Sequence, residues 1–230
     1  RIQYNHVHHM KYVGSEAKPT HSSSGKQSAL YYNQNNTFPA EAVSGNVMAY
    51  NLIHHAEHGV RMKCNDNKKP GDAPWSVYNN VIYKTQIGVC WYSTGARNPH
   101  NKPGITCRNN IILQPQRHFV QLAPATIKEF DQVIFDHNLY WPEMPEGFVW
   151  PGGKGGFAAW SAWTAGTKRG GHSKLAAPRL AAPGEAKFRP QAGSPAIDAG
   201  ADVGYTKDYA GTKVPQGSAP DIGAYEAHAE

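Results

Sequence analysis

Long apolar runs are missing from the sequence, and none reaches the roughly 18 residues that a membrane-spanning helix needs. The N-terminal residues also lack the charged, apolar and small-residue segments of a signal peptide. Cysteine is scarce: Cys64, Cys90 and Cys107 show no metal-ligand spacing, and an odd count rules out complete pairing within the chain. We therefore expect no membrane span, no visible targeting signal, and thiols that are buried or inert.

Charged residues are also few, at 17% against 40% hydrophobic residues, and this balance excludes a disordered chain. The 23 Gly and 17 Pro are typical of a turn-rich β protein, and the length suits a single domain. The net charge of +6 favours an anionic partner, such as an acidic polysaccharide. We find no Gly-rich phosphate loop, nucleic-acid-binding motif or continuous Lys/Arg run, which argues against nucleic acid.

A repeat of Asn followed by apolar residues runs through the first half of the chain. The aligned positions are Asn5, Asn51, Asn80, Asn110 and Asn138. The last three intervals are 29, 30 and 28 residues, whereas the first interval is 46 and implies an insertion. The positions two residues after and three residues before each Asn are apolar throughout. A fixed period of this length indicates a solenoid.

A further apolar strand recurs about ten residues after the Asn, as in Val60-Arg61-Met62 and Val89-Cys90-Trp91. Three short strands per coil predict a right-handed parallel β-helix of about five coils over residues 1–141. The Asn would occupy a turn, where it tolerates left-handed backbone and its amide can bond the neighbouring coil. Residues 142–230 would form an irregular tail that packs on the last coil and caps the same domain. Because Arg1 already lies inside the repeat, we expect that an N-terminal region is missing.

Two motifs near the C-terminus carry a family resemblance. Ala-Gly-Ser-Pro-Ala-Ile-Asp-Ala-Gly at 192–200 and Pro-Asp-Ile-Gly-Ala-Tyr-Glu at 220–226 resemble the C-terminal signature of bacterial β-helix polysaccharide lyases and glycoside hydrolases. The segment 158–180 is similar to the connector of the same proteins, and the resemblance covers about residues 46–226. It implies a secreted carbohydrate-active enzyme, extracellular or periplasmic. Some of these lyases use calcium, so calcium is a candidate cofactor here.

The outward positions of the third strand form the best candidate catalytic site. Aligning Tyr31 with Lys63 and Tyr92 places these residues in one column, with Arg61 beside it. The expected substrate-binding residues are basic or imidazole side chains of the neighbouring loops and turns: Lys68, Lys69, Lys84, Arg97, His100, Lys102 and His55. The alternative is that all of these are ordinary solvated surface residues.

The chemistry that suits this column is β-elimination from a uronate. Removal of the proton next to the sugar carboxylate needs a base, an acid and a cation that neutralises the carboxylate. Arg61 could pair with the carboxylate, while Lys63 or a tyrosine moves protons. β-Helix lyases use Lys, Arg, Tyr or His in such roles, and the resemblance supports this assignment at the level of residue type only.

A second cluster consists of the histidines of the turn after the Asn strand: His8, His9, His54, His55 and His58, with Glu57 and Lys84 nearby. Such a cluster could bind a transition metal or supply an acid and a base. No motif such as His-Glu-x-x-His occurs, so we interpret the histidines as a structural ladder and predict no metal site.

Two other functions remain open. A glycoside hydrolase needs two facing carboxyl groups, for which Glu57 and Asp66 are the best pair that the coils offer. A non-catalytic glycan-binding or structural β-helix, such as a surface fibre or adhesin module, needs no catalytic residues at all. The sequence leaves the glycan and the oligomeric state undetermined.

Overall fold

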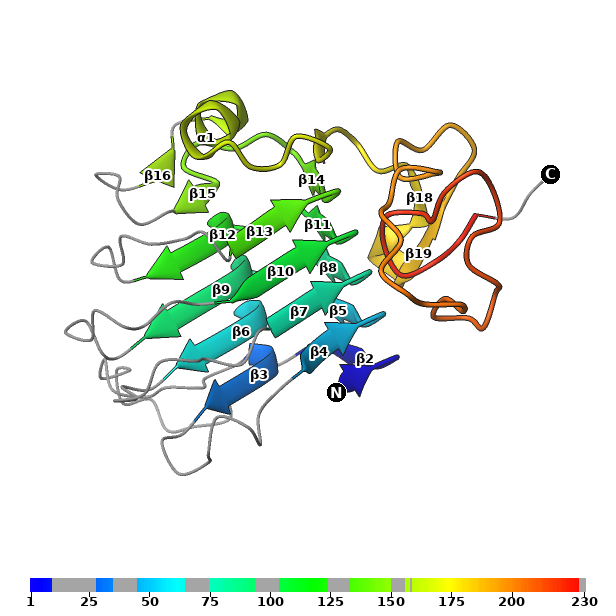
Figure 1. Ribbon diagram of the computed structural model, residues 1–230, viewed down its shortest axis with the longest axis horizontal. Helices are drawn as coiled ribbons and strands as arrows, with labels where there is room; N and C mark the ends of the chain where they lie inside the picture. The colour runs from blue at the N-terminus through cyan, green and yellow to red at the C-terminus, as the bar shows by residue number, and fades with distance from the viewer. Residues whose placement is uncertain are drawn as a thin grey trace.

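The computed structural model describes residues 1–9, 28–34, 45–64, 75–93, 104–123, 133–149, 156–157 and 159–227. Three sheets stack strand upon strand along the length of the molecule (Figure 1). Within these three sheets all described strands pair in parallel except one antiparallel edge strand, so the chain folds as a parallel β-helix of about five coils. The predicted fold class is confirmed.

Each coil contributes one strand to each sheet. The first sheet contains β1 (Ile2–Gln3), β4 (Asn46–Ala49), β7 (Trp75–Tyr78), β10 (Ile105–Arg108) and β13 (Val133–Asp136). The second sheet contains β2 (His6–His8), β5 (Leu52–His54), β8 (Val81–Tyr83), β11 (Ile111–Leu113), β14 (Leu139–Trp141) and β17 (Lys174–Leu175). The third sheet contains β3 (Ser28–Gln34), β6 (His58–Cys64), β9 (Ile87–Ser93), β12 (His118–Ala123), β15 (Phe148–Val149) and the antiparallel β16 (Gly156–Phe157).

The repeated asparagines form a buried ladder in the turn between the first and second sheets. The backbone N–H of Asn51 donates to Oδ1 of Asn80 at 3.0 Å, and the side-chain Nδ2 of Asn51 donates to the same oxygen at 2.9 Å. Asn80 bonds Asn110 in the same way, at 3.1 and 2.9 Å. The ladder ends where the N–H of Asn138 donates to Oγ of Ser173 at 3.0 Å. The ladder therefore joins every coil to the next.

The left-handed backbone of this turn lies one residue earlier than predicted. Tyr50, Asn79, Asn109 and His137 have φ between 51° and 58°, whereas the ladder asparagines are not among the positive-φ residues. The amide of each ladder Asn bonds the Asn of the neighbouring coil. The residue before it therefore makes the turn between the two sheets, in the left-handed conformation. Asparagine was expected at the left-handed position, and Asn79 and Asn109 show that it is tolerated there as well.

The core consists of columns of like residues. Ile53, Ile82, Ile112 and Tyr140 stack inside the second sheet, and each is at most 2% exposed. Cys107 belongs to a similar column inside the first sheet, and Cys90 is also buried, so both free thiols agree with the prediction. Burial raises the pKa of the Cys90 thiol to about 12, which leaves it unreactive at neutral pH.

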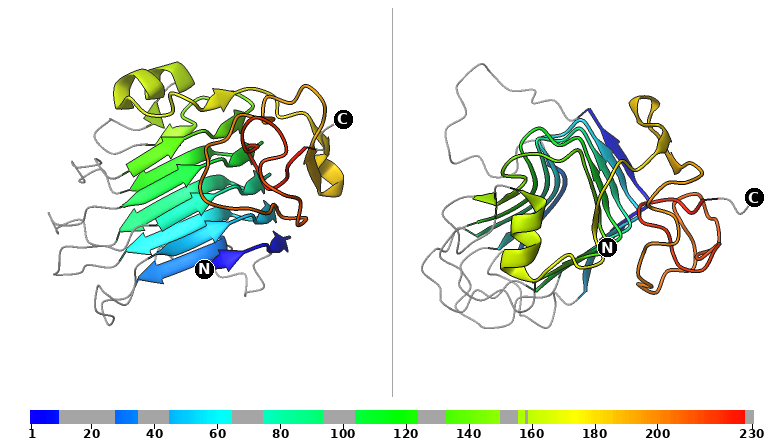
Figure 2. Two further views of the ribbon diagram at one scale, coloured as in Figure 1. Left: turned by 45° about the vertical axis from the view of Figure 1, so that its right-hand side comes forward. Right: turned by 90° about the horizontal axis from the view of Figure 1, so that it is seen from above.

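The tail, residues 142–230, covers the end of the stack and also adds strands to two of the sheets. Helix α1 (Trp160–Thr167) covers the end of the stack, and Trp163 stacks on Phe148 with ring centroids 4.5 Å apart. The sheets also extend beyond Trp141, because β15 and β17 pair in parallel with β12 and β14. The later part of the tail then runs beside the coils, outside the stack, as the two views of Figure 2 show.

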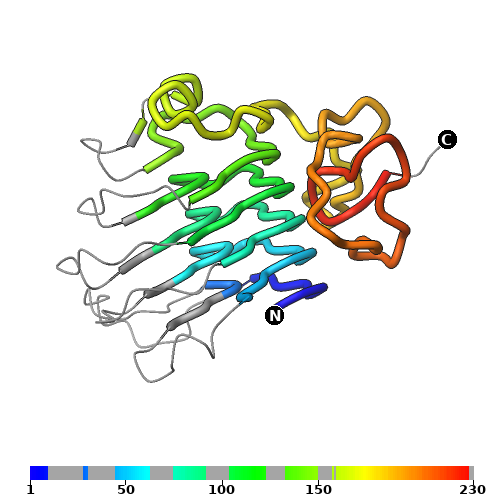
Figure 3. Tube along the Cα trace, in the orientation of Figure 1, coloured from blue at the N-terminus to red at the C-terminus, as the bar shows by residue number. Residues whose placement is uncertain are grey.

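This side-on segment covers the outer face of the second sheet. It contains the short elements β18 (Leu180–Ala182), η2 (Pro183–Glu185) and β19 (Lys187–Pro190). Its buried residues Phe188, Ile222 and Ala224 share a hydrophobic cluster with outward residues such as Val81 and Ile111. The tail follows the side of the coils toward the N-terminal end (Figure 3). It contacts the first coil, where Nε2 of Gln3 donates to the hydroxyl of Tyr205. The outer face of the second sheet is consequently closed to a large ligand along much of its length.

The acidic residues of the C-terminal signature hold the tail together. Oδ1 of Asp221 accepts the N–H of Asp198 at 2.8 Å, and Oε1 of Glu226 accepts the N–H of Asp221 at 3.0 Å. Burial raises the pKa of both Asp221 and Glu226. These carboxyl groups organise loops of the tail. No helix in the described part of the chain has the length and apolar character of a membrane span.

Candidate functional site

The third sheet places two of the predicted catalytic positions on neighbouring rungs. Lys63 of β6 pairs with Tyr92 of β9, and Tyr92 pairs with Ala123 of β12. Arg61 lies two residues before Lys63 and pairs with Cys90. The predicted register of Lys63 with Tyr92 is therefore confirmed for the backbone.

The predicted register of Tyr31 is wrong. Tyr31 of β3 pairs with Arg61, and Asn33 rather than Tyr31 pairs with Lys63. A shift of two residues keeps every side chain on the same face of a strand, so the alternation of apolar residues fits both registers equally well. Tyr31 thus belongs to the Arg61 row and not to the Lys63 row.

Most of the predicted substrate-binding residues fall outside the described residues. These are the residues of the connecting loops: Lys68, Lys69, Arg97, His100 and Lys102. The side chains of Tyr31, Lys63 and Tyr92 also lie outside the described part of the structure. Of the two carboxyl groups considered for hydrolysis, Glu57 is described and half-buried, whereas Asp66 falls outside.

Arg61 contributes positive charge to the row that it occupies. Burial, reinforced by the charges of Arg61 and Arg117, lowers the pKa of His58 to about 4. Burial raises the pKa of the Cys90 thiol, and the positive charge of Arg61 partly offsets that rise. His58 is accordingly neutral at physiological pH, and Arg61 supplies the fixed positive charge here.

His55 and Lys84 lie at the corner between the second and third sheets, away from the Lys63 row. Both occupy left-handed turn positions, with φ of 55° and 49°, in a column that also includes His9 and Gln114. Consecutive rungs are tied by backbone hydrogen bonds, such as His55 N–H to Tyr83 O at 3.2 Å. Lys84 places its Nζ 5.2 Å from the centre of the Tyr83 ring. These two residues could contact a ligand at the corner between the second and third sheets but not one confined to the Lys63 row.

Five histidines converge at this corner, in the first two coils. We call them the histidine corner: His6, His8, His9, His54 and His55. The rings of His8 and His54 stack at 5.0 Å, and those of His9 and His55 stack at 4.8 Å. Nδ1 of His54 lies 2.8 Å from Nδ1 of His55. The stacked ladder expected from the sequence is present, and it brings ring nitrogens close together.

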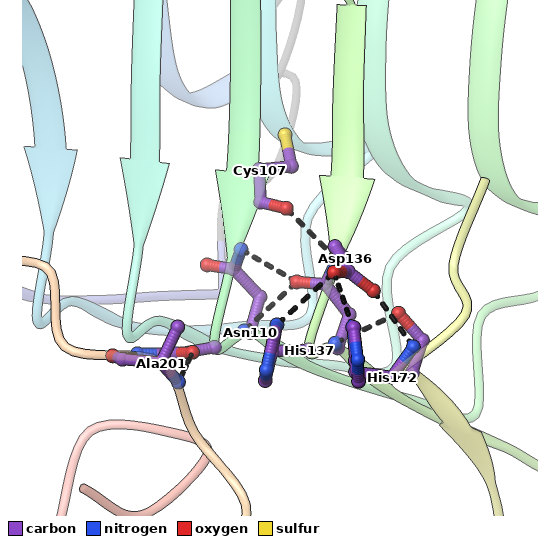
Figure 4. A network of polar contacts seen from close by, with 9 residues as sticks. Cys107, Asn110, Asp136, His137, His172 and Ala201 are labelled. Carbon is purple, nitrogen blue, oxygen red and sulfur yellow. Dashed lines mark hydrogen bonds and ion pairs between the residues drawn. The ribbon is translucent and has the colours of Figure 1, made fainter.

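A third group joins the last coil to the tail and was not predicted. Oδ1 of Asp136 accepts the backbone N–H of His172 at 2.8 Å, and Oδ2 lies 2.8 Å from Nδ1 of His172 (Figure 4). Nδ1 of His137 lies 3.2 Å from the same Oδ2. Burial would raise the pKa of Asp136, but its hydrogen bonds with His172 and the nearby His137 outweigh burial and lower it.

The Asp136 group separates two surface cavities of about 540 and 390 Å³. The larger is lined by β13 and the segment after α1, and the smaller by that segment and residues 198–200. The contacts of Asp136 with His172 hold the segment after α1 against the last coil, so the structure supports a structural role for this group. His172 is 36 residues from Asp136 and outside the repeat, so no sequence signal could have paired them.

Comparison with protein-family models, with curated proteins and with solved structures yields no match.

Proposed function

We propose that the protein is a secreted carbohydrate-active enzyme, a polysaccharide lyase that cleaves an acidic, uronate-containing glycan by β-elimination. The observation that carries the proposal is the pairing of Lys63 with Tyr92 on adjacent rungs of the third sheet, with Arg61 two residues away. A proton-transferring pair and a fixed cation are the groups that this reaction needs.

The parallel coils suit a polymer substrate. Equivalent positions of successive coils lie roughly 4.8 Å apart, so rows of side chains run across the strands along the whole stack. A glycan lying along the third sheet would meet Arg61 and Lys63 on β6 and Tyr92 on the adjacent β9. The net charge of +6 favours an anionic polymer over a neutral one.

Each residue has a proposed role. Arg61 pairs with the uronate carboxylate, and its planar guanidinium suits a bidentate contact. Lys63 and Tyr92 remove the proton next to the carboxylate and return a proton to the leaving sugar oxygen. His55 and Lys84, at the corner, would contact the glycan beyond the cleaved bond.

An ultraviolet assay on a panel of acidic glycans tests the proposal. β-Elimination produces an unsaturated uronate that absorbs ultraviolet light, whereas hydrolysis produces saturated reducing ends. We expect absorbance to grow with at least one uronate-containing glycan, such as alginate or pectate, and not with a neutral glycan. Parallel reactions with added calcium and with a chelator will show whether calcium takes part.

Two outcomes would count against the proposal. Release of saturated reducing ends without new absorbance would indicate a hydrolase. Binding of an acidic glycan without any cleavage, in the presence and absence of calcium, would indicate a non-catalytic binding module.

A further inference from the structure

We propose that the histidine corner is a binding site for one divalent transition-metal ion, with ring nitrogens of His9, His54 and His55 as its protein ligands. The proposal does not depend on the glycan cleavage proposed for the third sheet, although His55 is also a proposed glycan contact. It revises the sequence-based prediction that these histidines are only structural.

The geometry of the three rings supports the site. One ring nitrogen each from His9, His54 and His55 lies within 4.8 Å of the other two. Zinc–nitrogen bonds of about 2.0–2.1 Å in a tetrahedral site place ligand nitrogens roughly 3.3 Å apart. The 2.8 Å between Nδ1 of His54 and Nδ1 of His55 differs from this by about 0.5 Å, and the 4.8 Å limit on the distances to His9 means that its ring would rotate to complete the site.

The hydrogen-bonding capacity of the rings points the same way. Nε2 of His6 lies 2.8 Å from Nε2 of His54, and Nδ1 of His8 lies 2.8 Å from Nδ1 of His9. A neutral imidazole has one N–H donor and one lone pair, so His54 can donate in only one of its two nitrogen contacts. A metal on Nδ1 of His54 would leave Nε2–H to donate to His6, which fixes the tautomer.

The surroundings preorganise the rings. His54 is 5% exposed and packs against Phe188 of the tail, with ring centroids 5.8 Å apart. His9 and His55 occupy equivalent left-handed turn positions in successive coils, with φ of 51° and 55°. The repeat of the coils therefore stacks the rings of His9 and His55, and His54, the last residue of β5, is the third ligand.

The ligand set selects the class of metal. Neutral imidazoles suit Zn²⁺, Co²⁺, Ni²⁺ and Cu²⁺, whereas Ca²⁺ and Mg²⁺ require oxygen ligands. Three protein ligands leave a coordination position for water or an anionic group of a ligand. Lys84, on the next rung, opposes a cation by charge repulsion, so its removal should tighten binding.

Metal titration of the full-length chain tests the site. After treatment with a chelator, the protein is titrated with Co²⁺ and followed by visible absorption, and with Zn²⁺ and followed by calorimetry. We expect one equivalent to bind, with no competition from Ca²⁺. His55→Asn and His9→Asn should each weaken Zn²⁺ affinity at least tenfold, and Lys84→Asn should strengthen it. Asparagine tolerates the left-handed backbone at all three positions, so these variants should fold.

The controls are His118→Asn, which removes a histidine outside the corner, and Asp136→Asn, which disrupts the other group of potential ligands. Both should bind Zn²⁺ as the unmodified protein does. Three results would overturn the proposal: no Co²⁺ absorption band, unchanged affinity in folded His55→Asn and His9→Asn proteins, or loss of binding in Asp136→Asn alone. Circular dichroism of each variant establishes that it is folded.

Discussion

Replacing Asn80 with alanine is expected to lower the free energy of unfolding by about 3–5 kcal/mol. The Asn80 side chain is fully buried, and its Nδ2 donates to the backbone oxygen of Met48 at 3.0 Å and to Oδ1 of Asn110 at 2.9 Å. Its Oδ1 also accepts two hydrogen bonds from Asn51. Alanine removes all four bonds and leaves buried polar groups on the two flanking coils without these partners, at a cost of about 1–3 kcal/mol for each group left unsatisfied.

Chemical denaturation of the variant measures the loss. The control is Gln116→Ala, a change of an exposed amide, which should shift the free energy of unfolding by less than about 0.5 kcal/mol. A value for Asn80→Ala within about 1 kcal/mol of the unmodified protein would show that the ladder does not hold the coils together.

Lys63→Ala and Tyr92→Phe are expected to reduce the turnover of an acidic glycan at least about 100-fold each. Both changes remove a group that could transfer a proton at the third sheet. Arg61→Lys keeps the positive charge but loses the planar guanidinium that can contact a carboxylate through two hydrogen bonds. Substrate binding should weaken as a result, so the change should raise KM more than it lowers kcat. Initial rates from the ultraviolet assay give both constants.

A matched control is Lys187→Ala, which removes an exposed lysine whose Nζ lies 2.8 Å from Oε2 of Glu185 in the tail. Its rates should equal those of the unmodified protein. If Lys63→Ala and Tyr92→Phe also retain full activity, then the Lys63 row does not hold the reacting groups, and catalysis must take place elsewhere on the molecule.

The sequence predicts the coils well because their spacing is nearly constant. Asn51, Asn80 and Asn110 recur at intervals of 29 and 30 residues, and the apolar columns beside them follow directly from that alignment. The insertion in the first coil removes this support, and the pairing of Tyr31 was therefore misplaced by two residues. Nothing in an alternating pattern distinguishes two registers that differ by one full period.

Contacts between the coils and the tail could not be predicted in the same way. The approach of Phe188 to His54 and of His172 to Asp136 depends on the path of an irregular segment, for which no periodicity exists. The histidine corner was recognised as a stacked turn, but the distances between ring nitrogens decide whether it suits a metal. Those distances depend on side-chain rotation, which residue spacing does not specify.

A crystal structure with a bound acidic oligosaccharide tests the central functional claim most directly. We predict that the sugar lies along the third sheet, with a uronate carboxylate on Arg61 and the bond to be cleaved beside Lys63 and Tyr92. A sugar bound instead at the histidine corner, or in the cavities beside Asp136, would contradict the claim.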